Sequence, residues 1–162
     1  MIDRSLSILI VEDEVPKSTQ IEIFLRGLCI PMEIRTARSV NAALDYLDEE
    51  VPDLMLLDMS LPTIDVNISN KESGGRPQGF GGIEVLRHMK YSAQSCPTIV
   101  VTGYEAFPRA GGDLDITQLK TELEQEFPNV LHGVLHYNST YETWKSELKM
   151  AFESFKSDKE SE

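Results

Sequence analysis

Acidic side chains follow two apolar runs of the sequence at the point where each run ends. Glu12 and Asp13 come directly after Ile8–Val11, and Asp58 comes directly after Leu54–Leu57. Each acid taken alone is typical of a helix N-terminus or a turn. Carboxylates that are brought close together, however, repel each other unless a proton or a cation joins them. Mg²⁺ prefers oxygen ligands and needs only one or two carboxylates, so the two runs indicate a magnesium site if they are neighbouring strands.

A hydroxyl group stands at the end of a third apolar run. Thr102 closes the run Thr98–Thr102 and is followed by Gly103. A hydroxyl at this place can donate a hydrogen bond to an oxyanion bound beside the metal. A β-branched residue is also ordinary in a strand, and for Thr102 alone that interpretation is favoured.

The elements that must position these residues alternate in type along the chain. Five β-rich runs are separated by stretches with apolar residues at the i, i+3, i+4, i+7 spacing of a helix, one of them preceded by a candidate N-cap at Ser39. The β-rich runs are Leu6–Val11, Met32–Thr36, Leu54–Leu57, Thr98–Thr102 and Val130–Tyr137. Such alternation predicts an α/β domain with a doubly wound parallel sheet, in which ligands bind at the carboxyl ends of the strands.

Composition excludes several classes of function. The chain has 162 residues, enough for one domain, and 27 acidic residues against 15 Lys and Arg give a net charge of -12. A chain this acidic is repelled by phosphate backbones, so we expect no nucleic-acid partner. No apolar run approaches the ~18 residues of a membrane span, and the two cysteines have no metal-type spacing. These features predict a cytoplasmic protein without a membrane or zinc site.

Three short motifs together resemble the receiver domain of two-component response regulators. They are Ile8–Glu14 (ILIVEDE), Asp58 followed closely by Leu61-Pro62, and Thr102-Gly103. The resemblance covers nearly the whole chain, to about Phe155. It implies a flavodoxin-like fold with five helices and a five-stranded parallel sheet of order 2-1-3-4-5. It also implies a signalling protein rather than an enzyme.

The resemblance assigns a role to each candidate site residue. Asp58 matches the phosphoacceptor, which takes a phosphoryl group from a phosphohistidine on a sensor histidine kinase or phosphotransfer protein. Asp13 matches the direct Mg²⁺ ligand, Glu12 the acid that holds the ion, often through water, and Ser60 the residue whose backbone carbonyl is a further ligand. Thr102 matches the hydroxyl that closes on the phosphoryl group. The downstream partner is unknown.

The end of the last predicted strand departs from the family. Receivers normally carry a lysine there, usually followed by proline. When Gly133 is registered with the family pattern, Tyr137 stands at the lysine position and Asn138 at the proline position. Nothing nearby in the sequence replaces the ammonium. Tyrosine offers one neutral hydrogen bond, so we expect the phosphorylated state to be held less firmly here.

Two segments and the terminus complete the predicted organisation. The receiver domain spans residues 1–156 and carries an inserted glycine-rich loop at 66–81, predicted to be a mobile lid or partner-contact loop. The stretch from Gly103 to Val130 is also longer than usual. A disordered acidic tail is expected at 157–162.

Two functions from different classes stay open. The first is a stand-alone receiver that is phosphorylated on Asp58 and signals by protein–protein contact, with a homodimer through the fourth helix, fifth strand and fifth helix as one option. The second is a pseudo-receiver adaptor that does not switch by phosphorylation, which Tyr137 favours. A flavodoxin-like enzyme or nucleotide binder is more remote, because no glycine-rich phosphate loop follows the first strand.

Overall fold

The fold is built on a five-stranded parallel sheet. The structure, a computed structural model, describes residues 4–64, 81–104, 106–107 and 111–161. The strands of this sheet, in spatial order, are β2 (Met32–Ala37), β1 (Leu6–Val11), β3 (Leu54–Leu57), β4 (Thr98–Thr102) and β7 (Leu131–His136). Counted along the chain, this is the order 2-1-3-4-5, and the predicted fold class is confirmed.

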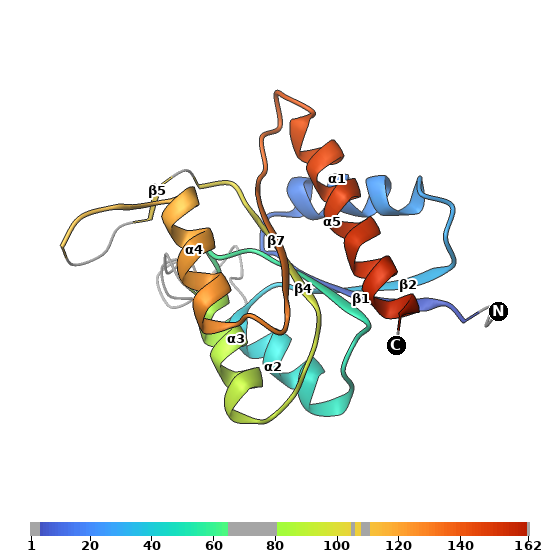
Figure 1. The fold of residues 1–162 in the computed structure, drawn as a ribbon, viewed down its shortest axis with the longest axis horizontal. Coiled ribbons are helices and arrows are strands. Elements are labelled where there is room, and N and C mark those ends of the chain that lie inside the picture. Colours follow the sequence, from blue (N-terminus) through green and yellow to red (C-terminus); the bar gives the residue numbers. More distant parts are fainter. Residues whose placement is uncertain (1–3, 65–80, 105, 108–110, 162) are drawn as a thin grey trace.

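Helices cover both faces of the sheet (Figure 1). The two helices on one face are α1 (Val15–Arg26) and α5 (Thr143–Glu160). The three on the other are α2 (Val40–Glu49), α3 (Gly81–Tyr91) and α4 (Ile116–Glu126). None of the described helices is long and apolar enough to cross a membrane.

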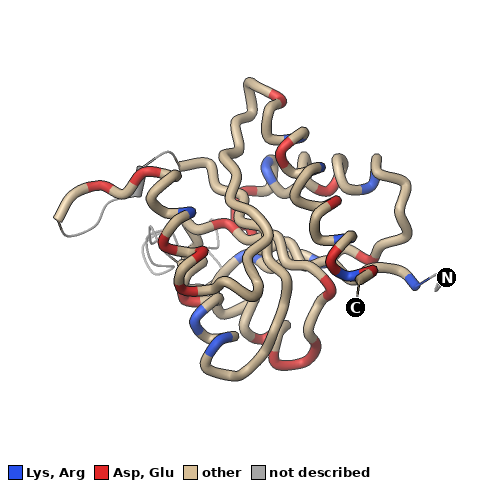
Figure 2. The backbone as a smooth tube through the Cα atoms, in the orientation of Figure 1, with Lys and Arg blue, Asp and Glu red and all other residues tan. Residues whose placement is uncertain are grey.

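The predicted strands follow from burial on both faces. All four residues of β3 and all five of β4 are buried, which is why their sequences are nearly continuous apolar runs. The predicted N-cap is also present, since the Ser39 hydroxyl accepts a hydrogen bond from the backbone N–H of Ala42 at 3.1 Å. Asp115 caps α4 through a reciprocal pair of hydrogen bonds with Gln118. Acidic positions lie along helices of both layers (Figure 2).

The long connection between β4 and α4 contains a small second sheet. Strands β5 (Ala106–Phe107) and β6 (Leu114–Asp115) pair antiparallel, and in Figure 1 they reach out beyond α4. The sequence predicted only that this connection is long. The predicted inserted loop at 66–81 lies outside the described residues except for Gly81, which is the first residue of α3.

The C-terminal helix is longer than the sequence indicated. We expected a disordered tail from residue 157, but α5 continues through Glu160. The reason is an anchor at each side of the expected boundary. Phe155 is buried against the sheet, and the Lys159 ammonium lies 2.8 Å from Asp53 Oδ1.

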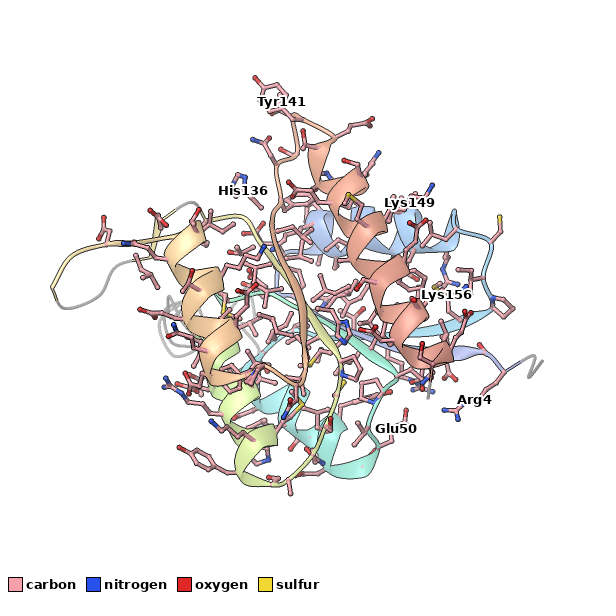
Figure 3. All side chains as sticks on the ribbon, in the orientation of Figure 1. Arg4, Glu50, His136, Tyr141, Lys149 and Lys156 are labelled. Carbon is pink, nitrogen blue, oxygen red and sulfur yellow. The ribbon has the colours of Figure 1, made fainter. Side chains whose placement is uncertain are left out.

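Asp53 links this helix end to β1 and to the residues before it. Its Oδ2 accepts a hydrogen bond of 2.8 Å from the backbone N–H of Ser7 in β1, and its Oδ1 contacts Lys159 and Arg4. Figure 3 shows Arg4 close to the N-terminal end of the described chain. Partial burial raises the pKa of Asp53, but the hydrogen bonds from Lys159 and Ser7 outweigh it, so the net pKa lies below its ordinary value.

Replacing Asp53 with Asn removes this charge and keeps the shape of the side chain. We expect D53N to lower the free energy of unfolding at pH 7 by about 1–2 kcal/mol, the usual size for charge-assisted hydrogen bonds. Because the folded pKa is lowered, the stabilisation exists above the unfolded value of about 3.9 and is lost as the pH falls through the folded value. Urea denaturation of D53N and the wild type should therefore converge below about pH 4. The exposed Asp45 gives the control D45N, and equal stability of D53N and the wild type at pH 7 would contradict this account.

Candidate functional site

Three carboxylates meet at one edge of the sheet. Strands β1 and β3 are neighbours with Val11 opposite Leu57, so the residues that follow them lie side by side. The backbone N–H of Asp58 continues this pairing by donating to the carbonyl of Val11 at 3.0 Å. Carboxylate oxygens of Glu12, Asp13 and Asp58 all lie within 4.8 Å of one another. The structure thus brings together the acids that the sequence singled out.

These acids are largely withdrawn from water. Glu12 is 2% exposed and Asp58 is 5% exposed, while Asp13 is half-buried. Burial, with the nearby Asp58 charge, raises the pKa of Glu12 to about 8 against the opposing effect of Lys17. The pKa of Asp13 is also raised, by burial and then by the charge of Asp58. Both directions mean that the buried position and the neighbouring carboxylate of Asp58 disfavour the charged forms of these acids.

A lysine that was not predicted from the sequence completes the cluster. Lys17, in the first turn of α1, is 3% exposed, and its Nζ lies 2.5 Å from Glu12 Oε1 and 3.2 Å from Asp58 Oδ1. The same ammonium donates a hydrogen bond of 2.8 Å to the carbonyl of Val101 in β4. The expectation that no ammonium stands near this site is therefore wrong, because one arrives from the first helix instead of the last strand.

The charge of Lys17 is favoured by its neighbours. Burial lowers its pKa, but Asp58 and Glu12 together raise it by more, so the pKa lies above its ordinary value and the side chain stays charged. One ammonium against three carboxylates leaves a surplus of two negative charges in their ionised forms. A divalent cation would balance this surplus.

The helical pattern explains how Lys17 reaches the site. The buried residues of α1 are Lys17, Ile21 and Leu25, spaced by four and therefore on one face of the helix. Pro16 stands at the start of the helix, where its missing N–H has no consequence. A lysine on the apolar stripe, four residues after Asp13, is the sequence signal that could have identified this residue.

Tyr137 approaches the site with its ring and brings no charge. Its backbone N–H donates to the carbonyl of Thr102 at 2.8 Å, directly after β7. Its ring centroid lies 5.7 Å from Lys17 Nζ and 5.1 Å from the ring of Trp144. Burial raises the pKa of Tyr137, so the phenol is neutral at pH 7. The aromatic face is thus available to the ammonium of Lys17.

The other predicted site residues lie on the same edge. Thr102 is fully buried at the end of β4, and its Oγ1 accepts a hydrogen bond from the backbone N–H of Tyr104 at 3.3 Å. Ser60 lies two residues beyond Asp58 and is buried. The start of α3 lies very close to the backbone of Asp58, because a Cβ at Gly82 would come within 2.5 Å of the backbone oxygen of Asp58. Glycine is therefore required there for close approach.

An open pocket of about 590 Å³ lies over the cluster. Its lining includes Lys17, Asp58, Gly103, Tyr104, His136 and Tyr137. In Figure 3, His136 lies at the end of β7 that leads toward Tyr141 and α5. The pocket gives a phosphate-sized group access to Asp58.

The residues present fit a hard divalent cation. Asp58 Oδ1 is out of contact with water and, apart from its ion pair with Lys17, accepts no hydrogen bond from the described residues. The oxygens of Glu12 are both engaged, by Lys17 and by the backbone N–H of Glu14. Asp13 and Asp58 are therefore the better direct ligands, with Glu12 suited to a water of the ion.

A doubly wound sheet of this order, with paired acids at the ends of its central strands, defines a flavodoxin-like domain with an acidic pocket at the switch point. Among solved structures, the signal receiver domain of an HD domain-containing protein from Pseudomonas fluorescens Pf-5 superposes with a TM-score of 0.65 at 19% identity, covering 98% of this chain and 100% of that one. That likeness is one of fold.

Sequence relatives give the family. The chain is 28% identical over 147 residues to the Detocs response regulatory protein DtcB of Enterobacter cloacae, covering 88% of this chain and 95% of the relative. It is 30% identical over 126 residues to DtcB of Vibrio alginolyticus, covering 74% and 80%. It is 32% identical over 118 residues to sporulation initiation phosphotransferase F of Bacillus subtilis, covering 72% and 73%. No family model matches the chain. The protein belongs to the response regulators of the receiver-domain family.

Magnesium should stabilise the fold through Asp13 and Asp58. At a concentration tenfold above its dissociation constant, an ion that binds only the folded state adds ~1.4 kcal/mol, or about 3–6 °C in melting temperature for a chain of this size. We expect D13N to lose this shift, and to be no less stable than the wild type without metal, since a repelling charge is gone. Thermal melts with MgCl₂ and with EDTA measure both effects. D45N should keep the shift, and an undiminished shift in D13N would show that the ion binds elsewhere.

Proposed function

We propose that this protein accepts a phosphoryl group on Asp58 from a phosphohistidine of a sensor histidine kinase or phosphotransfer protein, with Mg²⁺, and signals by contact with another protein. The observation that carries the proposal is the Asp58 carboxylate, buried beside two acids and an ammonium yet facing an open pocket. The printed names of its relatives, a response regulatory protein and a phosphotransferase, support the same chemistry.

The transfer step exchanges one bond to phosphorus for another. A carboxylate oxygen of Asp58 forms the new P–O bond while the N–P bond of the phosphohistidine breaks, and the electron pair of that bond stays on the imidazole nitrogen. Positioning and charge neutralisation supply most of the catalysis in such reactions. When bound, Mg²⁺ neutralises charge on the phosphoryl oxygens. Asp13 and Asp58 would hold it directly, with Glu12 acting through water and Ser60 through its carbonyl.

Thr102 is placed to respond to the modified site. Its side chain is buried at the end of β4, where Thr102 pairs with His136, the last residue of β7 before Tyr137. We expect its hydroxyl to turn from the backbone N–H of Tyr104 toward a phosphoryl oxygen. We propose that the protein contacts its downstream partner through the surface formed by α4, β7 and α5. A homodimer through the same surface is one form that this contact could take. The proposed place of action is the cytoplasm.

The adaptor without phosphorylation is the second candidate, and the structure weakens its main support. That support was the tyrosine at position 137, where the family has an ammonium. Lys17 supplies an ammonium to the same carboxylate by another route. The set Glu12, Asp13, Asp58 and Thr102 is also present at one edge of the sheet, which favours the phosphoacceptor.

Phosphorylation of Asp58 can be tested by intact mass. Incubation with acetyl phosphate and MgCl₂ should add one phosphoryl group to the wild type and to D45N, and none to D58N. Omission of the metal should suppress the added mass, because the surplus negative charge of the site then repels the donor. A phosphoryl group that persists on D58N would place the acceptor elsewhere. A wild type that takes none would favour the adaptor.

A further inference from the structure

We propose that Lys17 supplies the ammonium that holds the phosphoryl group on Asp58, and that Tyr137 positions it. This inference rests on the proposed function and names a residue of that site which lies in α1, far in sequence from the strand end where the family carries its lysine. The juxtaposition that supports it is Lys17 Nζ lying 3.2 Å from Asp58 Oδ1 with the ring of Tyr137 beside it.

Distance and geometry place Lys17 on the reacting group. Its Nζ lies 2.5 Å from Glu12 Oε1 and 3.2 Å from Asp58 Oδ1, and it donates a hydrogen bond of 2.8 Å to the carbonyl of Val101. A phosphoryl group on the Asp58 carboxylate adds oxygens directly beside this ammonium. Of the three partners, the Val101 carbonyl is the only uncharged one and makes the weaker kind of bond. We expect a phosphoryl oxygen to take its place, which alters a contact of β4 next to Thr102.

Stability alone does not account for a lysine at this position. Lys17 shares the buried face of α1 with Ile21 and Leu25, where an apolar residue would pack without desolvating a charge. Buried ion pairs are often no more stabilising than apolar residues of similar size. A charge kept on an apolar stripe, in contact with the acceptor carboxylate, points to a chemical role.

Tyr137 has the position and chemistry to hold Lys17 in place. Its ring centroid lies 5.7 Å from the ammonium and 5.1 Å from the Trp144 ring, so the ring contacts both. A cation–π contact of this kind favours the ammonium over a neutral group and limits where it can move. A lysine at position 137 would instead bring a second ammonium toward the first. The two arrangements are therefore alternative ways of placing one positive charge beside Asp58.

The test uses beryllofluoride, a non-covalent stand-in for the phosphoryl group, with the full chain. Trp144 is the single tryptophan and contacts Tyr137, so its fluorescence reports on the site. We expect K17M to bind beryllofluoride with MgCl₂ at least tenfold more weakly than the wild type, as for loss of a charged hydrogen bond. K17M should bind Mg²⁺ alone at least as tightly, because the acids lose their counter-charge. K149M, on exposed Lys149, is the control.

The positioning role of Tyr137 is tested with two single variants at this residue and with a double variant that moves the ammonium from position 17 to position 137. Y137F keeps the ring and should bind beryllofluoride like the wild type, whereas Y137A should lose about threefold, the size of a cation–π contact. The double variant K17M/Y137K carries its ammonium directly after β7 and should recover binding relative to K17M. A role confined to folding would not be restored by this exchange.

The outcomes separate the two proposals. If the wild type and K17M bind beryllofluoride equally well, the inference about Lys17 is overturned while the proposed function stands. Loss of both Mg²⁺ and beryllofluoride binding in K17M, with no recovery in K17M/Y137K, would show that Lys17 only maintains the fold of the site. A wild type that binds no beryllofluoride would overturn the proposed function and the inference together.

Discussion

The site depends on one electrostatic constraint. A parallel sheet brings the carboxyl ends of β1 and β3 to one edge, and the residues that follow them here are acids. Glu12 and Asp58 are almost fully buried, so their repulsion is only weakly screened by water. Among the described residues, the ammonium of Lys17 is the cation that contacts them, and the three carboxylates in their ionised forms would exceed it by two negative charges, which a divalent cation could balance.

Several elements of the fold position residues around this cluster of acids. Helix α1 begins right after the acids and turns Lys17 onto its buried face. Helix α3 begins with glycines, so that its first turn can lie against the backbone of Asp58 and Met59. Directly after strand β7, the ring of Tyr137 lies against the ammonium of Lys17, at the place where the family provides an ammonium of its own. The same positive charge is thus delivered from a different element of an unchanged architecture.

The sequence was sufficient to predict the sheet because both faces of its central strands are buried. The runs Leu54–Leu57 and Thr98–Thr102 match the observed strands residue for residue. The paired two-residue strands β5 and β6 were not predicted, because two residues carry no periodicity. The end of α5 was placed too early, since its anchor, Asp53, is distant in sequence and becomes visible only in three dimensions.

The acids of the site were predictable and the lysine was not, for a related reason. Glu12, Asp13 and Asp58 each follow an apolar strand, so strand order alone brings them together. Lys17 reaches Asp58 only because α1 packs on the sheet with this side chain on its buried face. Because the side chain is charged, a buried position was not expected from the sequence. Its spacing of four from Ile21 carried the information, although a lysine is ordinarily expected to face water.

A crystal structure with Mg²⁺ and beryllofluoride tests the role of Lys17 most directly. We expect Lys17 Nζ to lie within about 3.2 Å of a fluoride bound at Asp58, whereas an ammonium that stays on Glu12 and Val101 without contacting the fluoride would contradict this role of Lys17.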